Sequence, residues 1–109
     1  YQHVNTNGGF ARVDMPQGSW KNLSCIYDSN ALSSDKMIVY INGQRATNVQ
    51  YTEPTSGNTE SDYTYSNLGS RSDGYYFIGD VSTMTIYNRA LSANEVLHNY
   101  NALKGRFGL

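Results

Sequence analysis

Apolar and polar residues alternate along the first half of the chain, which predicts β-strands there rather than helices. The alternation has a period of two over residues 10–15 and 20–27, as expected of strands with one buried face. Residues 37–41 are apolar almost without interruption, which is typical of a central strand covered on both faces. The Asn-Gly pair at 42–43 favours a tight hairpin turn, because both positions of a type I′ turn need positive φ. Residues 44–51 are therefore the expected return strand.

The second half of the chain contains a long polar stretch followed by one more strand-like segment. Residues 53–73 are rich in Ser, Thr, Gly and Asn, and a loop of that length in a compact domain is usually functional or mobile. Residues 75–87 predict a last strand, in which the apolar positions change parity near 82–83. A β-bulge would produce that change, and two abutting strands are the alternative.

A short helix is expected over residues 92–104. Ser92 and Glu95 have the spacing of a capping box, and Leu91 lies where a hydrophobic staple would meet the first turn. Gly105 is placed to end the helix in a left-handed conformation, which leaves an apolar tail at 105–109. One face of the helix is apolar through Val96, Leu97, Tyr100 and Leu103. A helix this short must be stabilised by docking on the sheet.

Length and charge restrict what this chain can be. Its 109 residues amount to one domain at most, spanning residues 1–109. Only 16% of the residues are charged and the formal net charge is −1, which argues against a nucleic-acid partner and against a polybasic membrane anchor. No apolar run approaches the roughly 20 residues of a membrane-spanning helix. The single cysteine, Cys25, excludes an intrachain disulfide and is expected to be a small buried apolar residue.

The order of several short motifs resembles that of concanavalin A-like (laminin G-like) jelly rolls. These are Trp20 in a strand, the hairpin at 37–43, Gly79, and the sequence Ile-Tyr-Asn-Arg-Ala-Leu-Ser at 86–92, which is the most specific. The resemblance covers about residues 10–103 and implies an antiparallel β-sandwich with a short C-terminal helix. Members of this family are usually longer, so the chain is either a reduced domain or the C-terminal part of one. Such a part would expose an apolar face and need a covering partner.

Catalysis and metal binding find little support in the sequence. Glycosidases of this fold need two carboxylates about 5 to 9.5 Å apart, and only Glu60 and Asp62, in the polar stretch, are so spaced. His3 and His98 lack companions at metal-ligand spacing. We therefore expect no enzyme, no catalytic residue and no required cofactor or metal. Calcium is the one ion that oxygen-bearing residues could hold, through Asp28, Asn30 and Asp35 or through Asp73 and Asp80.

A carbohydrate site is the sharpest binding hypothesis. Tyrosines flank a stretch of short polar side chains, and sugars need aromatic faces to stack on and polar groups for their hydroxyls. The candidate residues are Tyr63, Tyr65, Arg71, Asp73 and Tyr75. The alternative is that these tyrosines pack on the sheet or contact a subunit.

The preferred interpretation is a non-enzymatic structural module. Residues 99–109 are similar to the ends of jelly-roll proteins in tailed-bacteriophage virions, which implies an accessory virion protein such as a head decoration, fibre or tail component, assembled in the host cytoplasm. Its partners would be further copies of itself or capsid and tail proteins, contacted through Tyr100, Arg106, Phe107 and Leu109. The alternative is a carbohydrate-binding or adhesion module of a secreted or cell-surface protein, with glycans as partners.

Overall fold

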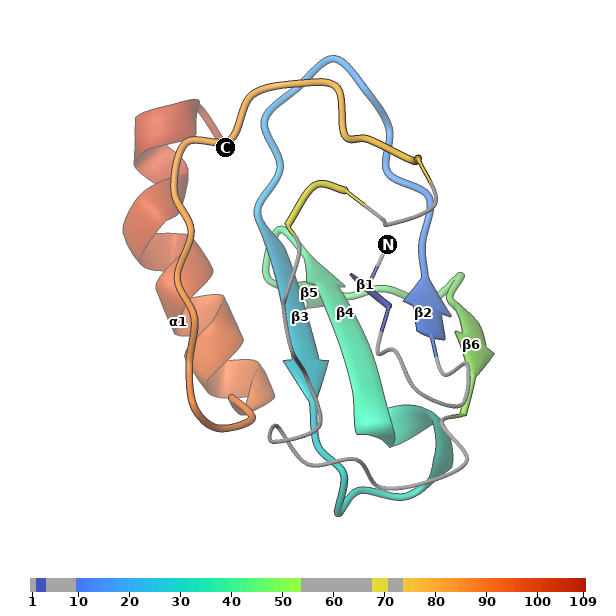
Figure 1. Ribbon diagram of the computed structural model, residues 1–109. Coiled ribbons are helices and arrows are strands. Elements are labelled where there is room, and N and C mark those ends of the chain that lie inside the picture. The colour runs from blue at the N-terminus through green and yellow to red at the C-terminus, as the bar shows by residue number, and fades with distance from the viewer. Residues whose placement is uncertain (1, 4–9, 54–67, 71–73) are drawn as a thin grey trace.

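The computed structural model describes residues 2–3, 10–53, 68–70 and 74–109 (Figure 1). This part of the chain forms two small antiparallel sheets, one α-helix and two short 3₁₀ helices, the first of which is η1 (Ser33–Lys36). The first sheet has the order β1-β2-β6 and the second the order β3-β4-β5. The strands are β1 (Gln2–His3), β2 (Phe10–Arg12), β3 (Leu23–Tyr27), β4 (Met37–Ile41), β5 (Gln44–Arg45) and β6 (Gln50–Thr52). The predicted class, antiparallel β with a short C-terminal helix, is confirmed.

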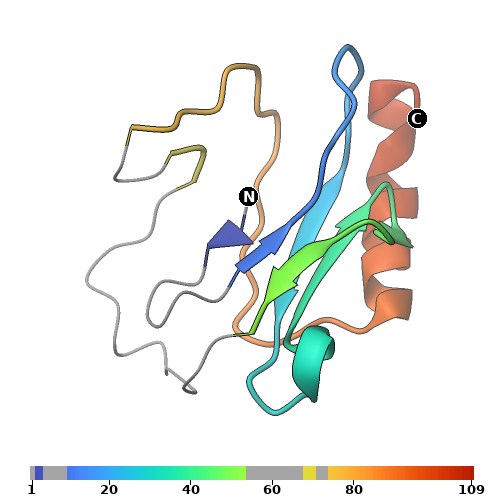
Figure 2. The same cartoon turned by 90° about the vertical axis from the view of Figure 1, so that its right-hand side faces the viewer.

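Strand β4 is the centre of the molecule, as its unbroken apolar sequence predicts. Met37 and Val39 are buried on the side of the first sheet, where they cluster with Ala11 of β2. Tyr40 is buried on the opposite side, where it meets Ile26 of β3 and the helix. Figure 2 shows the resulting order, with the helix against one face of the second sheet and β2 and β6 beyond the other. A strand that is covered twice has no room for polar side chains.

The hairpin between β4 and β5 has the predicted turn. Asn42 and Gly43 have φ of 51° and 76°, which are the positive values that a type I′ turn requires. Two hydrogen bonds join the turn to Asn22, the residue directly before β3. The Asn42 amide donates to the carbonyl of Asn22 at 2.8 Å, and the Asn22 amide donates to the Asn42 side chain at 2.9 Å.

The predicted return strand at 44–51 is wrong as a single element. Its first two residues form β5 in the second sheet, whereas Gln50–Thr52 form β6 and pair with β2 in the first sheet. Ala46 and Val49, between them, pack against the cluster around Val39. The chain therefore leaves one sheet and joins the other in order to bury these apolar side chains between the two layers.

The predicted last strand at 75–87 is also wrong, because this segment forms no named strand. The β-pairing that the structure describes for this segment is an isolated bridge between Ser70 and Tyr76. Its apolar side chains reach solvent, with Ile78 96% and Ile86 83% exposed. A strand needs neighbours for its backbone groups, and none of the strands that the structure describes pairs with residues 77–87.

Helix α1 (Ala93–Leu103) forms where the capping signals predict it. Ser92 is the N-cap, Val96 is buried, and Leu91 packs in the same cluster, as a hydrophobic staple requires. The predicted end is shifted. The helix continues into a 3₁₀ turn, η3 (Lys104–Phe107), so Gly108 rather than Gly105 adopts the left-handed conformation, with φ of 68°.

Cys25 is exposed, contrary to the expectation of a buried residue. It lies on β3, which is an edge strand, so packed neighbours cover only part of the side chain. The partial loss of water is still enough to raise the pKa of the thiol.

Candidate functional site

The best candidate site is a shallow pocket of about 310 Å³ between α1 and the segment that leads into it. The helix supplies polar side chains at i, i+4 spacing, which places them on one face. The leading segment supplies an aromatic, a cationic and an apolar side chain. The pocket is lined by Tyr87, Arg89, Leu91, Asn94, Glu95, His98 and Asn99.

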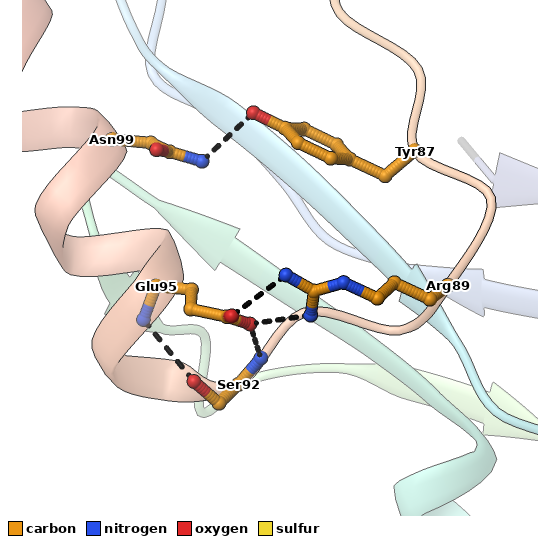
Figure 3. Close-up of polar contacts among 5 residues, drawn as sticks. All are labelled: Tyr87, Arg89, Ser92, Glu95 and Asn99. Atoms are coloured by element: carbon orange, nitrogen blue, oxygen red, sulfur yellow. Dashed lines mark hydrogen bonds and ion pairs between the residues drawn. The ribbon is translucent and has the colours of Figure 1, made fainter.

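A bidentate ion pair forms one wall of the pocket. The Arg89 guanidinium donates from Nη1 to Oε2 of Glu95 at 2.9 Å and from Nη2 to Oε1 at 2.8 Å (Figure 3). Oε2 also accepts from the Ser92 amide at 2.8 Å, and the Glu95 amide donates to Oγ of Ser92 at 3.2 Å. The capping box and the ion pair thus share one carboxylate.

The hydrogen bonds of this network determine the protonation state of the Glu95 carboxyl group. The Arg89 guanidinium, followed by the Ser92 amide, lowers the pKa of Glu95 to about 2. The same contact raises the pKa of Arg89. Glu95 is therefore ionised at neutral pH and cannot serve as a general acid there.

An aromatic ring held by the helix forms the other wall. The amide of Asn99 donates to the Tyr87 hydroxyl at 3.1 Å, which orients the ring along α1 (Figure 3). Tyr87 is 47% exposed, so the ring is accessible while it is held in place. His98 and Asn94 complete the rim with exposed polar side chains.

The described lining of this pocket combines an aromatic face with several hydrogen-bonding groups. Glu95 is the one carboxylate among the described residues that line it, whereas glycoside hydrolysis uses two. Over the part of the chain that the structure describes, no group of three His, Cys, Asp or Glu residues lies close enough to hold a metal ion.

The oxygen ligands considered for calcium are engaged in other contacts. Asp28 accepts from the amide of Asn30 at 2.9 Å, and Asp35 pairs with Arg45 at 2.6 Å. Asp80 lies on the exposed 77–87 segment, and Asp73 lies outside the described residues. The expectation of no required metal, with calcium as its alternative, stays a prediction.

Most of the predicted carbohydrate site lies outside the part of the chain that the structure describes. The members that lie outside it are Tyr63, Tyr65, Arg71 and Asp73. The remaining member, Tyr75, is 67% exposed. Tyr75 is not among the residues that line the pocket beside α1.

The residues predicted to contact a partner make contacts within their own chain. Tyr100 packs over Gly43 at the hairpin turn. Phe107 stacks against Trp20 with ring centroids 5.3 Å apart, and the Arg106 guanidinium lies 5.7 Å from the Phe107 ring. The Leu109 amide donates to a backbone carbonyl of η3 at 3.0 Å. These contacts hold the tail against the rest of the chain. Its role in a partner interface stays a prediction.

Sequence reasoning misses the pocket, although part of its signal is visible. The capping box indicates only a helix start, and Tyr87 and Arg89 stand out only as members of the family-like motif. The additional clue is the spacing of Asn94 with His98 and of Glu95 with Asn99, which aligns four polar groups beside the motif.

Comparison with known proteins places the fold in a family. The family model of the concanavalin A-like lectin/glucanases superfamily (laminin G type) matches residues 3–97. A crystal structure of an S-layer domain-containing protein from Clostridium thermocellum is similar, with a TM-score of 0.55 and 22% identity over 82% of this chain and 42% of that one. No curated protein matches the sequence. The match over most of the chain shows that this protein belongs to the concanavalin A-like lectin/glucanases superfamily.

Proposed function

We propose that this chain is a non-enzymatic carbohydrate-binding or adhesion module of a secreted or cell-surface protein, and that the pocket beside α1 receives a sugar unit. The observation that carries the proposal is the pairing of an exposed, hydrogen-bonded Tyr87 ring with planar polar side chains across a pocket of about 310 Å³. Sugar rings present CH faces that stack on aromatic rings and hydroxyl groups that need donors and acceptors.

Two further findings support this proposal over a role in a virion. The matched superfamily includes lectins by its description, and the similar structure belongs to an S-layer domain-containing protein. Neither match is to a bacteriophage protein, so the virion interpretation gains no support. Among the described helices, none combines the length and apolarity needed to cross a membrane.

A glycan array probed with the purified protein tests the proposal. We expect binding to at least one glycan, a loss of at least tenfold on Tyr87→Ala, and retention in Tyr87→Phe, which keeps the ring. Tyr75→Ala is the matched control, because Tyr75 is an exposed tyrosine outside the pocket.

The outcomes separate the two candidate sites. Loss of binding in Tyr75→Ala with retention in Tyr87→Ala would move the site to the tyrosines that the sequence pattern indicates. The absence of any glycan bound at millimolar affinity or better would refute the carbohydrate proposal. Release of free sugar from a bound glycan would contradict its non-enzymatic part.

A further inference from the structure

The pocket beside α1 carries a cation and an anion that cancel each other. Among the described residues that line it, Arg89 and Glu95 hold the formal charges when His98 is taken as neutral. Both side chains are accessible, since 59% of the Arg89 side chain and 41% of the Glu95 side chain is exposed. Their two hydrogen bonds, of 2.9 and 2.8 Å, hold the charges together (Figure 3). A ligand therefore meets a neutral pair at this wall rather than a free guanidinium.

The positive end of the helix is also occupied. A helix N-terminus attracts anions through its unpaired amides and its dipole. In α1 the Ser92 amide donates to Oε2 of Glu95, and the Glu95 amide donates to Oγ of Ser92. The Glu95 carboxylate thus already stands where an anionic ligand would gain most from this end of the helix.

Glu95 can still accept one hydrogen bond from a ligand. Of the hydrogen bonds that the structure describes, two end on Oε2, from Arg89 and Ser92, and one ends on Oε1, from Arg89. A carboxylate oxygen has two lone pairs, so Oε1 has room for one more donor. A sugar hydroxyl can supply that hydrogen, whereas an ionised sugar carboxylate has none to give.

Two carboxamides in the pocket can both donate and accept. The side chains of Asn94 and Asn99 each carry an acceptor oxygen and an NH₂ donor. Hydroxyl groups also work in both directions, so they can satisfy both ends of a carboxamide. An ionised carboxylate only accepts, and it would leave the amide oxygen without a donor.

We propose that this pocket selects uncharged sugars over sugar acids and that Glu95 sets the preference. The carboxylate neutralises Arg89, which would otherwise attract an acidic sugar, and its own charge repels one. Selective sites depend on such repulsive elements as well as on attractive contacts. The inference rests on the proposed function, because it concerns which glycan the same pocket receives.

Pairs of glycans that differ in one group test the proposal. One member of each pair ends in glucose, galactose or mannose, and the other ends in the matching uronic acid, in which a carboxylate replaces the C6 hydroxymethyl group. We expect the unsubstituted protein at neutral pH to bind the hexose member at least about fivefold more tightly. This factor is the effect of one unit charge about 4 Å away in water.

Two substitutions should change the ratio of the two affinities in opposite directions. Glu95→Gln frees the Arg89 cation and keeps a capping side chain, since glutamine also serves in a capping box. The preference for the hexose should then fall at least about fivefold. Arg89→Gln leaves the carboxylate unpaired, so the preference for the hexose should rise. Equal losses for both members of each glycan pair would show a purely structural role and overturn the inference.

Asp35→Asn is the matched control. Asp35 pairs with Arg45 at 2.6 Å, the two side chains are 56% and 51% exposed, and neither residue lines the pocket. This substitution frees an arginine elsewhere on the surface, so it should leave the ratio of affinities unchanged.

The outcomes distinguish this inference from the proposed function. Binding that depends on Tyr87 but takes the uronic acid as well as the hexose would overturn the inference alone. An unchanged ratio in Glu95→Gln, or the same change in Asp35→Asn, would also overturn it alone. Binding to no glycan, or binding that does not depend on Tyr87, would refute the pocket as a sugar site and the inference with it.

Discussion

Replacing Gly43 by alanine tests how the hairpin and the helix are packed together. Gly43 is buried in the turn with φ of 76°, a conformation that costs a residue with a Cβ about 1–2 kcal/mol. A Cβ at this position would lie 2.8 Å from Cδ1 of Tyr100, 3.1 Å from Cδ1 of Leu97 and 3.2 Å from Cβ of Tyr100. The last atom is fixed to the helix backbone, so rotation of the tyrosine ring cannot relieve the contact.

The expected loss is the sum of two effects. Overpacking of this kind costs about 1–3 kcal/mol, which together with the strained φ gives about 2–5 kcal/mol. Urea denaturation followed by far-UV circular dichroism measures it. In thermal melts the same loss corresponds to about 4–8 °C for each kcal/mol in a domain of this size.

Gly18→Ala is the matched control for the backbone effect alone. Gly18 has φ of 92°, and a Cβ added there would meet no atom within 4 Å, so only the cost of positive φ applies. We expect Gly43→Ala to be the more destabilising by at least about 1 kcal/mol. Equal losses would show that α1 does not press on the turn, and the docking of the helix on the hairpin would be refuted.

Two further predictions concern α1 and the tail. Because the folded pKa of Glu95 is about 2 against an ordinary 4.5, its stabilising contribution is present above pH 4.5 and is lost as the pH falls toward 2. The urea midpoint should therefore fall less steeply between pH 7 and 2 in Glu95→Gln than in the unsubstituted protein. The same dependence of the midpoint on pH in both proteins would contradict the bond to Arg89. Phe107→Ala should shift the emission of Trp20, its stacking partner, to longer wavelength, whereas Leu109→Ala should not. Identical spectra for the two variants would show that the ring contact does not form in solution.

The parts of the fold that could be predicted from the sequence are those held by local signals. The Asn-Gly turn at 42–43 and the Ser92 capping box specify their own backbone conformations, and both occur at the expected positions. The unbroken apolar run of β4 likewise indicates a strand covered on both sides. Each of these signals is complete within about ten residues.

The parts that failed depend on distant neighbours. The alternation at 44–51 indicates a strand but not which sheet it joins, and the chain switches sheets within it. The alternation at 77–87 indicates a strand only where a pairing edge is available. The pocket escaped prediction for the same reason, because Tyr87 and Asn99 come together only when α1 turns back along the segment before it.

The order of the strands has a consequence for how the protein tolerates change. The whole second sheet is inserted between two paired strands of the first sheet. The chain leaves β2 at Arg12 and enters β6 at Gln50, and these two residues lie opposite each other in the ladder. The two ends of this 13–49 unit therefore lie about 5 Å apart, one interstrand spacing. Insertions within its loops need not alter that distance, so the loops of this unit are where added residues should be tolerated best.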